Sequence, residues 1–201
     1  MDSVDPNAQC PRCGKALDLC VCEAIQPFPT RTHVLILQHP QEPDVELGSA
    51  RVLHLSLPRS TLRVGLSWPN LKAALGRDFT EPKEIVPSRW VVLHLGSGIK
   101  GAEEAPPRAA GPSLVLLDKK GAPLADQKQP IDGLVLLDGT WSQAKTLWWR
   151  NAWLLKCRRA VLVPAHPSLY RELRREPRRE CLSTIESAAE ALVAVGEAPE
   201  I

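Results

Sequence analysis

The stretch at residues 134–153, LVLLDGTWSQAKTLWWRNAW, holds four of the six tryptophans of the chain and changes character at Asp138. The apolar residues before Asp138 predict a buried strand, Asp-Gly predicts a turn, and the residues after it predict a helix. A carboxylate at the end of an apolar strand is costly to bury and has no place in an ordinary core. We therefore expect a functional site at Asp138.

Apolar runs without polar alternation recur from Thr32 onward and alternate with helical stretches. Such runs are typical of strands buried on both faces, and hence of a mainly parallel sheet. The last helix is marked by STIE, in which Ser183 and Glu186 form a capping box. Expected strands cover residues 33–38, 62–66, 90–95, 113–117, 134–137 and 160–163, and expected helices cover 48–57, 70–75, 142–151 and 183–195. The alternation predicts one α/β domain over residues 29–201.

Residues 1–28 differ from the rest of the chain and contain four of its six cysteines, in CPRCGKALDLCVC. These are Cys10, Cys13, Cys20 and Cys22. Four reduced thiolates at this spacing can close a tetrahedron around Zn²⁺. A redox CxxC motif and incidental cysteines are the alternatives, but neither accounts for four cysteines so close together. We expect a structural zinc knuckle followed by a linker.

The charge of the chain is unevenly distributed. Residues 145–179 carry ten Lys or Arg and two acidic residues, a net charge of +8 against −6 for the rest. A basic block of this kind predicts a polyanionic partner such as nucleic acid, the alternative being a solvated helix face with internal ion pairs. The first ten residues, MDSVDPNAQC, have no signal-peptide pattern, and no apolar run could span a bilayer. We expect a cytoplasmic protein that does not enter a membrane.

Ligands of open α/β sheets collect at the carboxyl ends of the strands. Three expected strand ends carry distinctive residues: LHLGSG, LLDKKG and LLDGTW. LHLGSG fits neither of the common phosphate-binding fingerprints, and LLDKKG is most simply a turn. LLDGTW is different, because a turn needs Asp-Gly but does not need the Thr-Trp that follows.

The core of LLDGTWSQA, formed by Asp138, Thr140 and Trp141, resembles the signature of the DTW-domain family. Three further stretches agree in the expected order along nearly the whole chain. The four-cysteine knuckle resembles the N-terminal zinc motif of the family. LILQHPQE, with His39 and Glu42, resembles its first strand and following loop, and SLYRELRREP…CLSTIESAAEAL resembles its Tyr-Arg segment and final helix.

The resemblance implies a tRNA-uridine aminocarboxypropyltransferase, which moves the 3-amino-3-carboxypropyl group of S-adenosylmethionine (SAM) to N3 of a uridine. It also implies a SPOUT-like α/β fold with a C-terminal trefoil knot that binds the cofactor. Two alternatives remain open: a SPOUT-type RNA methyltransferase, and a non-catalytic zinc-dependent RNA-binding module. A passive RNA binder has no need of a buried acid at Asp138. The protein is expected to be a monomer or a homodimer.

In this reading Asp138 is the expected base for the uridine N3 proton, made more effective by burial beside Trp141 and oriented by Thr140. The alternative role for Asp138 is to bind the ammonium group of the transferred chain. Cofactor contacts are expected from strand ends and from the N-terminus of the last helix, where the helix dipole favours the methionine carboxylate. They are Leu95, Gly96, Leu116, Leu117, Leu136, Asp138, Trp141, Ser183 and Thr184.

The expected tRNA contacts combine phosphate-binding cations with a tyrosine that can stack on a base. They are His39, Glu42, Lys145, Tyr170, Arg171, Arg174, Arg175, Arg178 and Arg179. Among the other tryptophans, Trp148 is expected to pack against the sheet, whereas Trp149 and Trp153 are candidates for RNA or interface contacts. Cys157 and Cys181 are expected to be unpaired, small apolar residues.

Overall fold

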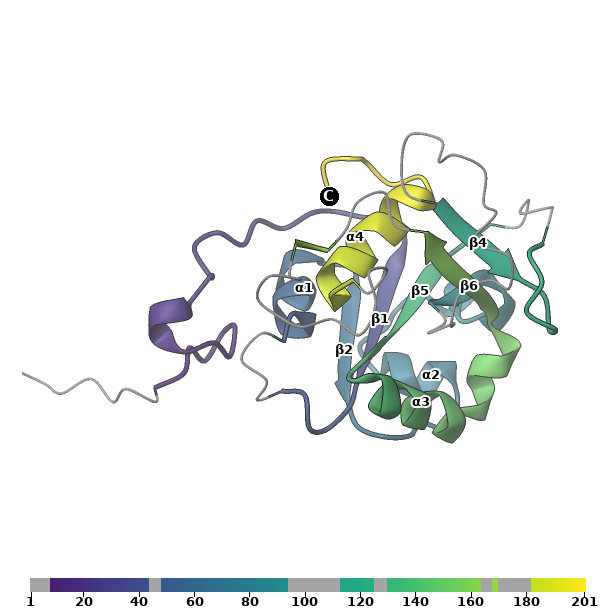
Figure 1. The fold of residues 1–201 in the computed structure, drawn as a ribbon, viewed down its shortest axis with the longest axis horizontal. Helices are drawn as coiled ribbons and strands as arrows, with labels where there is room; N and C mark the ends of the chain where they lie inside the picture. Colours follow the sequence, from purple (N-terminus) through teal and green to yellow (C-terminus); the bar gives the residue numbers. More distant parts are fainter. Residues whose placement is uncertain (1–7, 44–47, 94–112, 125–129, 164–167, 170–181) are drawn as a thin grey trace, which may run out of the picture.

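The structure is a computed structural model that describes residues 8–43, 48–93, 113–124, 130–163, 168–169 and 182–201. Among these residues, one six-stranded sheet forms the centre of the molecule (Figure 1). Its strands are β1 (His33–Gln38), β2 (Ser60–Val64), β3 (Trp90–Leu93), β4 (Ser113–Leu117), β5 (Gly133–Asp138) and β6 (Arg158–Val163). The strand order is β2-β1-β5-β3-β6-β4, and only β4 runs antiparallel to its neighbour. The expected α/β class with a mostly parallel sheet is confirmed.

Helices cover both faces of the sheet, which explains the uninterrupted apolar strands (Figure 1). The helices are α1 (Ala50–Ser56), α2 (Leu71–Leu75), α3 (Trp141–Arg150) and α4 (Thr184–Ala194), with short 3₁₀ helices at Leu17–Leu19, Pro82–Glu84, Pro87–Arg89 and Ala152–Lys156. Val34 and Ile36 of β1 enter the core under α1 and α4. Leu35 and Leu37 enter the core with α2 and α3 on the other face. The four expected helices all exist, and their ends lie within two residues of the prediction.

The close approach of β5 and β3 depends on a residue without a side chain. A Cβ on Gly133 would lie 2.5 Å from the Trp90 ring, which is fully buried. The Trp90 indole donates to the Glu84 carbonyl at 2.6 Å, so its polar atom is satisfied although the ring is enclosed. Gly133 and Trp90 thus fix the amino end of β5 and leave its carboxyl end for Asp138.

The cysteine-rich segment projects from the main body on the side of α1 (Figure 1). Its attachment includes charged side chains that donate to backbone carbonyls. Arg51 of α1 donates to Pro11 O at 2.6 Å and to Arg12 O at 2.9 Å, and Lys15 donates to Gly48 O at 2.6 Å. Within the described ranges, no helix has the length and apolar character needed to cross a membrane.

The tryptophans after Asp138 have three different environments. Trp148 packs against the core that contains α2 and α3, as expected. Trp149 is 77% exposed. The expectation for Trp153 was wrong: this side chain is 5% exposed, belongs to the same core and donates to Asn151 Oδ1 at 3.3 Å. Helix α3 ends at Arg150, and the following 3₁₀ turn rotates Trp153 inward.

Candidate active site

Asp138 lies at the carboxyl end of β5, in the middle of the sheet, and is 6% exposed. Because β1 and β5 are parallel and in register, Asp138 pairs with Gln38, the last residue of β1. The Gln38 amide donates to Asp138 Oδ2 at 2.8 Å, and the Thr184 hydroxyl at the start of α4 donates to Asp138 Oδ1. Both oxygens of this buried carboxyl group therefore have a donor, as an ionised carboxylate requires.

Gln38 is a site residue that the sequence prediction missed. The available signal was an amide directly after the apolar run VLIL. Asp138 follows LVLL in the same way, so both apolar runs end in a polar side chain. Gln38 is 4% exposed and is the direct neighbour of Asp138 across the sheet. The pair forms only because β5 is inserted beside β1, and strand order cannot be read from either stretch alone.

Thr140 caps helix α3, and its hydroxyl bonds within that helix and not to Asp138. Its hydroxyl accepts from Gln143 N at 3.4 Å, and the Gln143 side chain accepts from Thr140 N at 2.6 Å. Gly139 bridges strand and helix with a φ of +149°, a conformation that favours glycine, and an added Cβ would lie 2.9 Å from Gln143 Cβ. The expected task of orienting Asp138 therefore falls to Gln38 and Thr184. Thr140 sets the direction of the helix.

The hydroxyl groups at the start of α4 are already engaged. Ser183 caps the helix by accepting from Glu186 N at 3.3 Å and donates to Glu186 Oε2 at 2.7 Å. Glu186 also accepts from Ser168 Oγ and Leu169 N. Burial raises the pKa of Glu186, but these hydrogen bonds outweigh it and hold the pKa below its usual value. The N-terminus of α4 thus already has a carboxylate of its own, which competes with the expected binding of a ligand carboxylate at Ser183.

The other expected cofactor residues are dispersed. Leu136 is buried in β5 two residues before Asp138, and Trp141 opens α3, with Lys145 Nζ at 5.9 Å from the centroid of its ring. Leu116 and Leu117 do not lie at the end of the sheet where Asp138 lies. β4 is antiparallel to β6 and pairs Leu117 with Arg159, so its carboxyl end lies at the opposite edge of the sheet. Leu95 and Gly96 lie outside the described residues.

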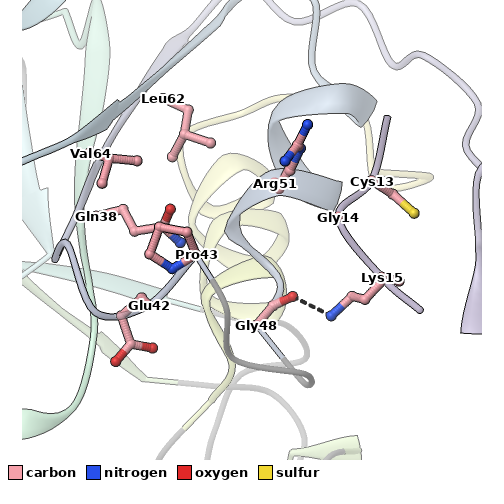
Figure 2. A pocket seen from close by; sticks show the side chains of 10 residues that line it. All are labelled: Cys13, Gly14, Lys15, Gln38, Glu42, Pro43, Gly48, Arg51, Leu62 and Val64. Atoms are coloured by element: carbon pink, nitrogen blue, oxygen red, sulfur yellow. Dashed lines mark hydrogen bonds between the residues drawn. The ribbon is translucent and has the colours of Figure 1, made fainter. Parts of the chain in front are cut away.

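The loop after β1 forms one wall of a pocket of about 140 Å³. Figure 2 shows Gln38, Glu42, Leu62 and Val64 on one side, with the knuckle and the start of α1 opposite. The pocket is lined by Cys13, Gly14, Lys15, Gln38, Glu42, Pro43, Gly48, Arg51, Leu62 and Val64. Because Gln38 both lines this pocket and contacts Asp138, the pocket and the Asp138 site share a side chain.

His39 and Glu42, two of the expected tRNA contacts, lie beside the Asp138 turn. His39 N donates to Asp138 O at 3.0 Å, and Glu42 N donates to His39 O at 3.0 Å. His39 is half-buried and Glu42 is 8% exposed. Lys145 is exposed on α3. Tyr170, Arg171, Arg174, Arg175, Arg178 and Arg179 lie outside the described residues, as does Cys181.

The four N-terminal cysteines come together as the spacing predicts and could hold a metal ion. Their sulfur atoms lie within 4.8 Å of one another. Cys10 Sγ and Cys22 Sγ are 3.6 Å apart, and Cys13 Sγ and Cys20 Sγ are 3.8 Å apart. Four thiolates around a tetrahedral Zn²⁺ would be separated by about 3.8 Å. Hydrogen bonds from the backbone of Cys13 and Arg12 lower the pKa of Cys10 to about 6, whereas burial and the neighbouring thiols raise the pKa of Cys22 to about 12.

Fold and site together define a mostly parallel α/β protein with a buried carboxylate at a central strand end and a separate four-cysteine site. A family model described as DTW domain matches residues 7–201. The chain belongs to the DTW-domain family.

Curated relatives match over most of the chain and share one name, tRNA-uridine aminocarboxypropyltransferase 2. The protein from Mus musculus is 27% identical over 202 residues, covering 96% of this chain and 58% of the relative. That from Macaca fascicularis is 28% identical over 192 residues (92% and 55%), and that from Drosophila melanogaster is 29% identical over 206 residues (99% and 72%). The chain thus spans less than two thirds of the two mammalian relatives. No solved structure matches significantly.

Proposed function

We propose that this protein is a tRNA-uridine aminocarboxypropyltransferase that uses SAM as its donor and acts on tRNA in the cytoplasm. The observation that carries the proposal is Asp138, the first residue of the family signature, which is buried at a central strand end and held by Gln38 and Thr184. The family membership and the shared name of the relatives support it. A buried, oriented acid of this kind has a chemical use in a transferase and none in a passive RNA binder.

The proposed reaction is a problem of positioning. The sulfonium of SAM activates three carbon atoms, so the enzyme selects aminocarboxypropyl transfer by presenting the γ-carbon of the methionine part to uridine N3. In the step, N3–C forms, C–S breaks with its electron pair going to sulfur, and the N3 proton leaves. Misplacement of the reacting atoms by about 1 Å can cost on the order of 10²-fold in rate. A site built on rigid strand ends suits this demand.

Asp138 has two roles open to it: to remove the N3 proton, or to bind the ammonium group of the transferred chain. The two internal donors favour the second role. Gln38 and Thr184 donate to the two carboxylate oxygens and hold the group in one orientation. A fixed, oriented anion is suited to hold a cationic group in one position.

The proposed cofactor pocket has Leu136, Asp138, Trp141 and Thr184 along its described side, with Ser183 as a helix cap beside it. Leu95 and Gly96 belong to the same proposed pocket. Leu116 and Leu117 do not, because the carboxyl end of β4 lies at the opposite end of the sheet from Asp138. The insertion of β5 between β1 and β3 returns the chain to the middle of the sheet. The mostly parallel sheet supports the proposed SPOUT-like class, and the C-terminal trefoil knot rests on the family resemblance.

The proposed organisation has two parts, a zinc knuckle with its linker over residues 1–28 and a catalytic domain over residues 29–201. The sulfur separations of the four cysteines fit tetrahedral zinc, which would supply structural stability. We assign tRNA contact to His39, Glu42, Lys145, Tyr170 and the arginines of the basic block. Trp149, exposed on the same helix as Lys145, is available for stacking.

The test is transfer from SAM labelled separately in its methyl carbon and in its carboxyl carbon, followed by mass spectrometry of the nucleosides of tRNA. Carboxyl label in a modified uridine is the expected result. Methyl label would make the protein a methyltransferase instead. Absence of both labels from RNA that the protein binds would leave only the RNA-binding module.

A further inference from the structure

Glu42 is a mostly buried residue whose carboxylate has no partner among the residues that the structure describes. Its residue is 8% exposed, and it lines the pocket between the knuckle and the ends of β1 and β2. Among the residues that the structure describes, no hydrogen bond or ion pair reaches its carboxylate. The carboxylate oxygens of Glu42 keep contact with solvent, whereas both oxygens of Asp138 accept hydrogen bonds inside the fold.

The two cations that line the same pocket are engaged elsewhere. Lys15 donates to Gly48 O at 2.6 Å, and the Arg51 guanidinium donates to Pro11 O and Arg12 O. Both lie across the pocket from Glu42 (Figure 2). The knuckle and α1 thus place two cations, both already bonded to backbone carbonyls, opposite a carboxylate that accepts no hydrogen bond from the described residues. A ligand with both hydrogen-bond donors and acceptors would complete this arrangement.

The lining matches the imide edge of uracil. That edge has one N3–H donor between two carbonyl acceptors, so it needs one acceptor flanked by donors. Glu42 supplies the acceptor, Gln38 supplies an amide, and Lys15, whose ammonium group already donates to Gly48 O, lines the same pocket. Pro43, Leu62 and Val64 add apolar surface for the faces of a flat ring. The volume of about 140 Å³ is on the order of ten times the minimum that holds one water molecule, and enzymes that modify a base commonly enclose it in such a pocket.

We propose that this pocket is the subsite for the acceptor uracil and that Glu42 accepts its N3 proton. The inference rests on the proposed function and divides the work between two carboxylates. Glu42 takes the N3 proton as the nitrogen lone pair forms the bond to the γ-carbon, the C–S electron pair returns to sulfur, and methylthioadenosine leaves. Asp138 holds the ammonium group of the donor. Gln38 lines the acceptor pocket and donates to Asp138, so it lies between the two substrates.

The experiment compares wild type, Glu42→Gln, Asp138→Asn and the exposed control Glu200→Gln in single-turnover transfer from SAM to tRNA. For Glu42→Gln we expect a rate lower by about 10²-fold or more at neutral pH, the usual contribution of a general base, with unchanged SAM affinity. The deficit should shrink at alkaline pH, and also on tRNA transcribed with 5-fluorouridine, whose N3 proton is more acidic. The deficit of Asp138→Asn should persist under both conditions, and Glu200→Gln should match wild type. A near-normal rate for Glu42→Gln, or a deficit that is the same on both RNAs, would overturn the assignment.

Thermal unfolding separates this role from a structural one. Because the Glu42 carboxylate makes no hydrogen bond or ion pair with the described residues, Glu42→Gln should leave the ligand-free protein equally stable or more stable, as is common for active-site groups. Marked destabilisation would show that Glu42 supports the fold and would count against the proposal.

Photocross-linking to tRNA that contains 4-thiouridine locates the base without requiring catalysis. The expected cross-links lie on peptides with Gly14 and Lys15 or with Leu62 and Val64. Transfer with cross-links only elsewhere would overturn the pocket and leave the proposed function intact. Cross-links in the pocket without any transfer would overturn the proposed function and the role of Glu42 as a base, while the uracil subsite would stand.

Discussion

At the scale of single residues, the site is built from an amide and an acid that end neighbouring strands. Gln38 and Asp138 are separated by 100 residues in sequence and are direct partners in the sheet. Thr184 reaches the same carboxylate from the start of α4. A side chain held on both oxygens loses little freedom when a ligand binds, which is the physical basis of preorganisation.

Asp138→Asn should abolish transfer while leaving the fold intact. The amide has the same shape but no charge, and its NH₂ group would face the Gln38 amide or the Thr184 hydroxyl in place of an acceptor. We expect a transfer rate lower by at least about 10²-fold, with a circular dichroism spectrum like that of wild type. Near-normal turnover would refute any chemical role for Asp138.

His33 gives a second prediction at this scale, on stability. It is buried at the start of β1 against Phe79 and Trp90, and burial lowers its pKa to about 4. The unfolded chain takes up this proton near its ordinary pKa of about 6.5. The stability that depends on neutral His33 is therefore complete above about pH 6.5. It is lost as the pH falls toward 4, which lowers the free energy of unfolding by roughly 3 kcal/mol.

Urea titrations over that pH range should show this loss of stability in wild type. The variant His33→Phe removes the titrating group and keeps a ring beside Phe79 and Trp90. Its stability should depend less on pH between 6.5 and 4. Equal slopes for the two proteins would show that other groups cause the acid sensitivity.

At the scale of elements, the cysteine knuckle has a place in the site as well as in the fold. Cys13, Gly14 and Lys15 form one wall of the pocket that Gln38 and Glu42 line, and Arg51 attaches the Cys10–Cys13 loop to α1. Helix α1 is in turn linked to α4, because Ser49 Oγ accepts from Ile185 N at 3.2 Å. The knuckle is thus connected through two helices to the residue next to Thr184.

Removal of the metal should weaken tRNA binding more than SAM binding. Without a metal the four thiolates no longer hold the loop, so the pocket wall loses its shape while the strand ends remain. We expect chelator-treated protein and Cys13→Ser to show a higher KM for tRNA and a similar Kd for SAM. Cys157→Ala is the matched control, since Cys157 is a buried thiol whose pKa is raised to about 12 by burial. Native tRNA affinity in the metal-free protein would contradict this role of the knuckle.

At the scale of the whole molecule, a net charge of +2 conceals a separation of charge along the chain. The stretch 145–179 carries +8 and the rest −6. Its described part exposes Lys145, Arg150 and Lys156 on α3 and the turn after it, together with Trp149. These side chains give a basic and partly aromatic surface on the layer of α2 and α3, which suits a nucleic-acid backbone.

Replacing Arg174, Arg175 and Arg178 together by Ala should weaken tRNA binding and reduce its dependence on salt. Binding releases about one counterion fewer for each phosphate contact that is lost. The magnitude of the slope of log K against log salt should therefore fall by roughly one per contact. Filter binding over a range of salt concentrations measures both quantities. A lower affinity with an unchanged slope would mean that these arginines do not contact phosphate.

Much of this molecule follows from local sequence. Strands buried on both faces read as unbroken apolar runs, so β1, β4 and β5 were predicted nearly residue by residue, and STIE marked the start of α4. The four cysteines also met as their spacing predicted, because a short loop confines their sulfur atoms. Asp138 stood out because no core strand needs a terminal carboxylate.

Only the tertiary structure decided which side chains meet. It placed Gln38 and Thr184 on Asp138, turned Trp153 into the core, sent the carboxyl end of β4 to the far edge, and set Glu42 in a pocket against the knuckle. The physical reason is that propensity and hydrophobic period act over a few residues, whereas strand order and direction depend on how the whole core is packed. The sequence therefore determined the elements and one acid, and packing determined the site.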